Sequence, residues 1–210
     1  MCQSRVVTTT PDDHSAAEWD ARYAEADRLW TAEVNPALAV EVSDLTPGRA
    51  LDVGSGEGAD ARWLADAGWQ VTAVDIAQVA VDRARALDPR PAITWVRADL
   101  RIDTVPGADF DLVALHYFPI ATADTNVART LIGAVGVGGT LLVVAHDPDG
   151  VRAHGRNPDD YLQPDDVAAL LGEDWSIVTA ETRERGRPGG SPNAVSHHHL
   201  DVVLRARRIR

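Results

Sequence analysis

The chain has 210 residues and a mass of 22.5 kDa, and 45% of its residues are hydrophobic, which is enough to build one domain with a buried core. Its formal net charge of −12 disfavours nucleic acid as a partner, because the phosphate backbone is also negative. The sequence has no lysine, which excludes Schiff-base chemistry and a P-loop lysine, and its single cysteine, Cys2, can form no internal disulfide.

No run of about 18 apolar residues exists to cross a bilayer. The polar stretch 11–14 near the start also lacks the apolar centre of a secretion signal. We therefore expect a cytoplasmic protein that binds neither membrane nor nucleic acid. The sequence leaves the oligomeric state open.

Two amphipathic helices are predicted before the first strand, over Ser15–Trp30 and Pro36–Leu45. Pro47-Gly48 then marks a turn into that strand. We expect residues 1–46 to form a helical lid on a core formed by residues 47–210.

Strand and helix patterns alternate in that core, which is typical of an α/β fold with a parallel sheet. The expected strands are Ala50–Val53, Gln70–Val74, Ala92–Arg97, Phe110–Leu115, Thr140–Ala145, Trp175–Thr182 and Leu200–Arg207. The expected helices are Ala59–Ala67, Val79–Leu87, Asn126–Val135 and Gln163–Leu171, with an irregular loop before the last of them.

A glycine-rich loop, Gly54-Ser55-Gly56-Glu57-Gly58, follows the first predicted strand. Glycine is suited to a loop that turns tightly and lies against a ligand, and the next helix presents free N–H groups. The loop also fits the dinucleotide pattern G-x-G-x-x-G/A, with Asp75 about 20 residues further on, where an NAD ribose ligand is expected. The loop alone therefore leaves an NAD(P)-dependent oxidoreductase open.

Asp52, two residues before the loop, favours a different cofactor. A carboxylate beside an anionic pyrophosphate is repelled, whereas the ammonium and sulfonium of S-adenosylmethionine are both positive. Asp75 and Asp99 follow the next two strands, where they can accept hydrogen bonds from ribose hydroxyls and from the adenine amino group. We therefore predict S-adenosylmethionine as cofactor and S-adenosylhomocysteine as product.

The same residues resemble the class I S-adenosylmethionine-dependent methyltransferases. The matching segments are Leu51–Gly58, Val74–Ile76, Ala98–Leu100 and Phe110–Val113. The resemblance implies a Rossmann-like, doubly wound sheet of seven strands in the order 3-2-1-4-5-7-6, with strand seven antiparallel and helices on both faces. The segment Trp19–Tyr23 and Trp30 are similar to the tellurite-resistance and thiopurine subgroup, which implies small or soft-atom acceptors.

The predicted site residues fall into two sets. The cofactor set is Asp52, Gly54, Ser55, Gly56, Gly58, Asp75, Ile76, Asp99, Leu100 and Trp30. The acceptor set is Trp19, Tyr23, Tyr117 and Phe118. Because Trp19, Tyr23 and Trp30 share one predicted helix face, they fit a core stripe as well as a lid over the cofactor.

Three histidines are candidate catalytic residues. His116 and His146 follow the fourth and fifth strands, and an antiparallel last strand brings His198 to the same edge. A general base, a metal site of facing imidazoles and a solvated polar surface all fit this pattern, and we assign no metal ligand.

Methyl transfer from a sulfonium is an in-line displacement that depends on positioning. We expect an enzyme that transfers the methyl group to a small molecule. A non-catalytic S-adenosylmethionine-binding protein remains an alternative.

Overall fold

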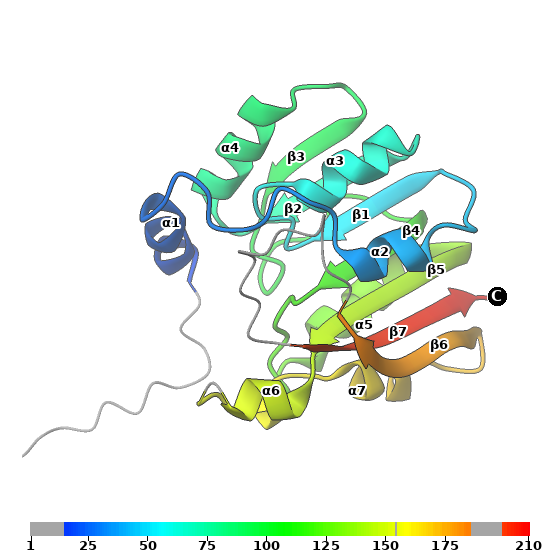
Figure 1. Ribbon diagram of the computed structural model, residues 1–210. Coiled ribbons are helices and arrows are strands. Elements are labelled where there is room, and N and C mark those ends of the chain that lie inside the picture. The colour runs from blue at the N-terminus through cyan, green and yellow to red at the C-terminus, as the bar shows by residue number, and fades with distance from the viewer. Residues whose placement is uncertain (1–14, 154, 186–198) are drawn as a thin grey trace, which may run out of the picture.

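The computed structural model describes residues 15–153, 155–185 and 199–210, which form a seven-stranded sheet flanked by helices (Figure 1). The strand order is β3-β2-β1-β4-β5-β7-β6. Strands β1 to β5 pair in parallel, and β7 is antiparallel to both β5 and β6, so the predicted order and the reversed strand are confirmed. The strands are β1 Arg49–Val53, β2 Gln70–Asp75, β3 Ile93–Arg97, β4 Phe110–His116, β5 Val135–His146, β6 Trp175–Glu184 and β7 Leu200–Arg208.

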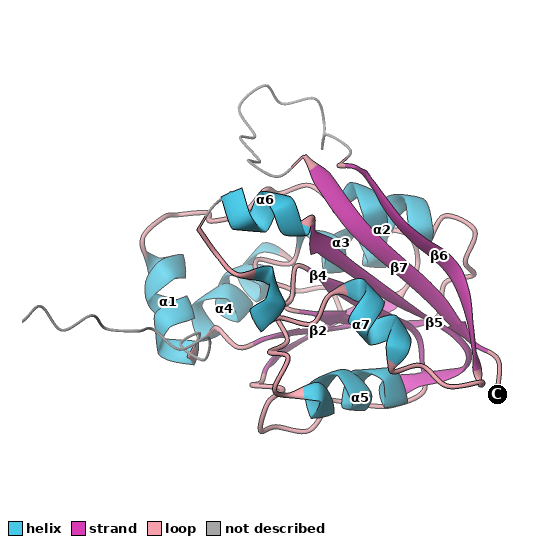
Figure 2. Cartoon of the chain, turned by 90° about the horizontal axis from the view of Figure 1, so that it is seen from below, coloured by secondary structure: helices cyan, strands magenta, loops and turns pink. Residues whose placement is uncertain are grey.

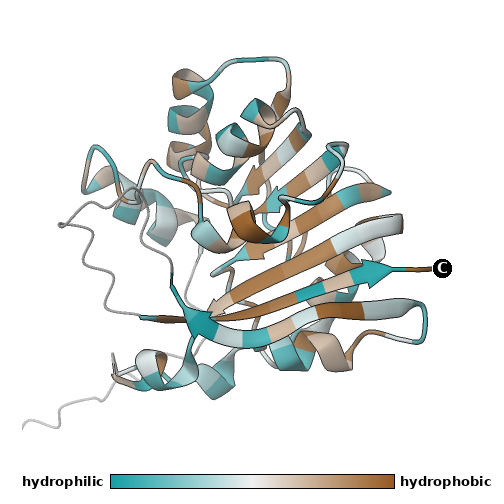
Figure 3. Ribbon diagram, turned by 45° about the vertical axis from the view of Figure 1, so that its right-hand side comes forward, coloured by the Kyte–Doolittle hydropathy of each residue, from teal (hydrophilic) through white to brown (hydrophobic). Residues whose placement is uncertain are grey.

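Helices cover both faces of the sheet, as predicted (Figures 1 and 2). One core packs α2 (Pro36–Glu41), α3 (Ala59–Asp66) and α4 (Gln78–Leu87) against the sheet, and the other packs α5 (Thr125–Ala134) and α7 (Pro164–Ala169). Side chains of a strand alternate between faces, so Ala50 enters the first core while Leu51 enters the second. Because both faces of the sheet are covered, the central strands are apolar along most of their length (Figure 3).

The first predicted helix is too long. Helix α1 spans only Ala16–Ala24, starting at a capping box between Ser15 and Glu18. Beyond it the backbone N–H groups of Leu29 and Trp30 donate to the Glu57 carboxylate (3.0 and 3.2 Å) instead of to helical carbonyls. The assignment of Trp30 to a helix face is therefore wrong, and a contact distant in sequence is the reason.

Other boundaries also differ from the prediction. Helix α2 ends at Glu41, before turns in which Ser43 and Leu45 donate to Val40 and Val42. Strand β5 begins at Val135, five residues before its predicted start at Thr140, with a register shift against β4. The loop expected after β5 contains α6 (Pro148–Ala153) and a short 3-10 helix (Pro158–Asp160).

No helix in the described ranges is both long and apolar enough to cross a membrane.

Gly58 gives a test of the turn between β1 and α3. It has a left-handed backbone (φ 77°), and a Cβ there would overlap the ring of Trp95, which is buried and donates to the Asp88 carbonyl. We expect Gly58→Ala to lower the free energy of unfolding by roughly 2–4 kcal/mol, measured by urea denaturation. Gly133→Ala in α5, where nothing lies within 4 Å of the added Cβ, is the control and should leave stability unchanged or raise it by up to about 1 kcal/mol. Similar losses in both variants would contradict this account of the turn.

Candidate functional site

The glycine loop after β1 makes the tight turn that its sequence predicts. Gly54, Gly56 and Gly58 all have positive φ (71°, 52° and 77°), which is costly for any other residue. The N–H groups of Gly54 and Ser55 both donate to the Val74 carbonyl of β2, at 2.8 and 2.9 Å. The loop is thus fixed against the end of the neighbouring strand.

Asp75, the last residue of β2, supports this loop. Its side chain is buried, and its carboxylate accepts hydrogen bonds from the Gly56 and Ala77 N–H groups, both at 2.8 Å. Burial raises the Asp75 pKa, while the two N–H groups oppose that shift. Each oxygen keeps a further lone pair, so the predicted ribose contact is compatible with these bonds. Ile76 follows at the same edge, where its carbonyl accepts Arg97 Nε at 3.2 Å.

Asp99 lies just beyond the end of β3, as predicted. Arg101, which the sequence did not single out, donates to its carboxylate in bidentate fashion (2.9 and 2.8 Å) and lowers the pKa of Asp99. Leu100 is half-buried at the border of the core under α5 and α7. A ligand group reaching Asp99 would therefore share the carboxylate with an arginine.

A buried cluster joins the ends of β1 and β4 to the first turn of α3. Asp52 is only 2% exposed, and its Oδ2 accepts no hydrogen bond from a described residue. His116 Nδ1 lies 2.9 Å from Asp60 Oδ2, at ion-pair distance, and Asp60 Oδ1 accepts the Asn35 N–H at 2.7 Å. The sequence pointed to Asp52 and His116 but missed Asp60, although a carboxylate in the turn after a glycine loop was a usable signal.

The cluster contains two carboxyl groups and one imidazole, and no arginine of the described residues forms an ion pair with either carboxyl group. Burial, and then repulsion by Asp60, raises the pKa of Asp52 to about 7. Burial alone would lower the His116 pKa, but the Asp60 carboxylate outweighs it and raises that pKa. The end of β1 is therefore a place where a positive charge is favourable.

Tyr117 and His146 stack beside this cluster, with ring centroids 4.2 Å apart. Tyr117 has a left-handed backbone (φ 54°), and its hydroxyl donates to the buried Asp201 at 3.0 Å. The Arg185 guanidinium lies 4.3 Å from the Tyr117 ring and contacts His146 Nδ1 at 3.2 Å. Since a guanidinium can only donate, His146 Nδ1 is the acceptor, and a neutral ring carries its proton on Nε2. His198, the third predicted histidine, lies outside the described residues.

The N-terminal segment and the stretch after β4 lie against the glycine loop. Tyr23 Oη accepts the Trp30 Nε1 hydrogen bond at 2.9 Å, and a Cβ added to Gly56 would lie 3.0 to 3.7 Å from atoms of these two side chains. A Cβ added to Gly54 would lie 2.9 Å from the Phe118 ring. Tyr23 is also buried among the α4 residues, next to Trp19, so the aromatic residues both pack and cover the loop.

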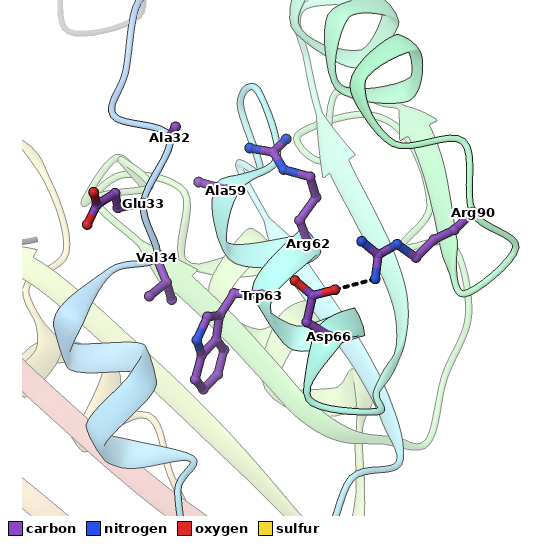
Figure 4. A pocket seen from close by; sticks show the side chains of 8 residues that line it. All are labelled: Ala32, Glu33, Val34, Ala59, Arg62, Trp63, Asp66 and Arg90. Carbon is purple, nitrogen blue, oxygen red and sulfur yellow. Dashed lines mark hydrogen bonds and ion pairs between the residues drawn. The ribbon is translucent and has the colours of Figure 1, made fainter. Parts of the chain in front are cut away.

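A hollow of about 330 Å³ lies elsewhere, between residues 32–34 and the outer side of α3 (Figure 4). Its lining includes Arg62, Trp63 and the ion pair between Asp66 and Arg90, and it contains none of the predicted cofactor residues. We therefore place the candidate site at the glycine loop and not in this hollow.

Comparison with known proteins gives matches to methyltransferases. Residues 50–137, from β1 into β5, match the model of a methyltransferase domain family. Uncharacterised methyltransferases of Mycobacterium tuberculosis and Mycobacterium bovis are 37% identical over 124 residues, which cover 56% of this chain and 61% of the relative. The match thus spans less than two thirds of the length of these relatives.

Solved structures share the fold across most of the chain. The N-methyltransferase NodS from Bradyrhizobium japonicum, in complex with S-adenosylhomocysteine, has a TM-score of 0.70 at 20% identity, covering 93% of this chain and all (100%) of its own. A structure from work on the conversion of a disulfide into a thioacetal in echinomycin biosynthesis has a TM-score of 0.72 at 22% identity. The alignment covers 93% of this chain and 92% of that structure. A TehB-like S-adenosylmethionine-dependent methyltransferase from Corynebacterium glutamicum has a TM-score of 0.58 at 18% identity. The alignment covers 92% of this chain and 95% of that structure.

Glu57 tests how the N-terminal segment is held. Its buried carboxylate accepts the Leu29 and Trp30 N–H groups and pairs with Arg83 at 3.2 Å. We expect Glu57→Gln to speed amide hydrogen exchange at residues 29 and 30 by about 5- to 30-fold, because roughly 1–2 kcal/mol of local stability is lost. The matched control is Glu33→Gln, an exposed glutamate of the same segment, which should leave both amides unchanged. Unaltered exchange in Glu57→Gln would show that the carboxylate does not anchor the segment.

Proposed function

We propose that this chain is a class I S-adenosylmethionine-dependent methyltransferase that transfers the methyl group of S-adenosylmethionine to a small-molecule acceptor. The observation that carries the proposal is the buried carboxylate of Asp52, which lies near the end of β1 beside the glycine loop with one oxygen unpartnered by described residues. Burying a carboxylate without a partner costs free energy, and a cationic ligand would supply the positive charge that balances it.

The remaining cofactor contacts follow from the strand ends. Asp75 offers lone pairs to the ribose hydroxyls, and Asp99 and Leu100 lie where the adenine would extend. The solved complex of NodS with S-adenosylhomocysteine supports this choice of cofactor. In an NAD(P)-dependent oxidoreductase the pyrophosphate would face Asp52, and like charges repel.

The acceptor side of the site lies at the ends of β4 and β5 in this proposal. Phe118 and Tyr117 form apolar walls, and His146 acts as a hydrogen-bond donor, because its Nδ1 is engaged by Arg185. His116, paired with Asp60, is the better candidate to receive a proton from the acceptor. His198 stays a prediction.

A small acceptor suits the covering of the loop by Tyr23 and Trp30, and we propose that the N-terminal segment acts as a lid through Trp19, Tyr23 and Trp30. The subgroup of small or soft-atom acceptors stays a prediction from the N-terminal sequence. We place this activity in the cytoplasm, without membrane or nucleic acid as a partner.

Asp75→Ala tests the cofactor assignment. We expect its affinity for S-adenosylhomocysteine, measured by calorimetry, to fall by about 30- to 1,000-fold, equivalent to roughly 2–4 kcal/mol, because the ribose acceptor and the bond to Gly56 are both lost. Asp82→Asn, an exposed aspartate of α4, is the control and should bind like wild type.

A melting curve without ligand shows whether Asp75→Ala is folded. Undiminished affinity in folded Asp75→Ala would contradict the assignment. A wild-type protein whose melting temperature is raised by NAD or NADP and not by S-adenosylhomocysteine would overturn the proposed function. Binding of the cofactor without methyl transfer to any member of a broad acceptor panel would favour the non-catalytic alternative.

A further inference from the structure

Asp52, Asp60 and His116 bring three metal-ligating atoms within 4.8 Å of one another. They come from three elements, the end of β1, the first turn of α3 and the end of β4, which meet at the carboxyl edge of the sheet. The cluster is thus assembled by the fold and not by neighbouring positions in the sequence.

Buried atoms in this cluster lack partners, which distinguishes it from an ordinary acidic surface. Asp52 Oδ2 and His116 Nε2 make no hydrogen bond to any residue in the described ranges, although both side chains are over nine-tenths buried. Native proteins rarely leave such atoms unsatisfied, so both are free to contact an ion or a water held in the cluster.

We propose that Asp52, Asp60 and His116 bind one divalent transition-metal ion. Two carboxylate oxygens and one imidazole nitrogen form a mixed donor set that suits Mn²⁺, Co²⁺ or Zn²⁺ better than Ca²⁺ or Mg²⁺, which prefer oxygen alone. Asp60 is held in place by the Asn35 N–H, the kind of outer contact that orients a metal ligand. Within residues 15–153, 155–185 and 199–210, no arginine forms an ion pair with either carboxylate, so the ion would supply the balancing charge.

The proposed ion competes with the proposed cofactor contact at one atom, but its binding is tested without any adenosyl ligand. An ion at this place would use the same Asp52 oxygen that we assign to the cofactor's ammonium, so the two cations would exclude each other. Metal binding and S-adenosylhomocysteine binding are therefore measured separately, and either can fail alone.

The test must first remove a competing chelator, since consecutive histidines bind transition metals by themselves. The full chain is therefore prepared with His197→Ala, His198→Ala and His199→Ala together. Mn²⁺ is then titrated into this protein and free Mn²⁺ is followed by electron paramagnetic resonance. We expect one bound Mn²⁺ per chain and a melting temperature that rises with Mn²⁺ concentration.

Two further variants in the same background locate the site. Asp60→Asn keeps an oxygen for the Asn35 N–H but loses the charge, and we expect it to weaken Mn²⁺ binding by about tenfold or more. Asp66→Asn on the same helix, whose carboxylate pairs with Arg90 at the surface, should bind Mn²⁺ as the background protein does.

The absence of stoichiometric binding of Mn²⁺, Co²⁺ and Zn²⁺ to the background protein would overturn the proposal. Equal affinity in Asp60→Asn and Asp66→Asn would overturn it as well. A melting curve without metal establishes that Asp60→Asn is folded, and His116→Gln serves as the second ligand variant if it is not.

Discussion

The hydrogen bonds of one buried carboxylate organise the candidate site. Asp75 accepts the N–H of Gly56 from the glycine loop and the N–H of Ala77 at the start of α4, so the end of β2 fixes both neighbours. These hydrogen bonds offset the cost of burying the carboxylate, which makes the loop conformation and the strand end depend on each other. The loop held in this way has positive φ angles at its three glycines and lies next to Asp52.

The buried acids of the described residues divide into two groups. Glu41, Glu57, Asp88 and Asp201 each form an ion pair with an arginine, at distances between 2.7 and 3.2 Å. Asp52 and Asp75 form no ion pair with an arginine of the described ranges, and both lie at the carboxyl ends of their strands. Within the first group, Glu41, Glu57 and Asp201 join separate elements of the fold, whereas Asp52 and Asp75 offer carboxyl oxygens where a ligand can meet them.

The sequence predicted what local patterns determine and missed what tertiary contacts determine. Apolar runs and turn residues gave all seven strands within a few residues of their positions, except for the early start of β5. The end of α1 was wrong because Leu29 and Trp30 bind Glu57, a partner far along the chain. Asp60 and Arg185 were missed for the same reason, because each takes its role from a partner that only the fold places beside it, whereas Arg101 pairs locally with Asp99, two residues before it.

Two histidines that are equivalent in the sequence prediction have opposite surroundings in the structure. His116 faces a carboxylate, which favours its protonated form, whereas His146 Nδ1 accepts a hydrogen bond from the guanidinium of Arg185. In methyl transfer only a group able to accept a proton can serve as a base, whereas a fixed donor can orient the acceptor. Under the proposed function the neighbours would therefore separate the two roles, and the proposed cation beside Asp52 and Asp60 would set the balance at His116.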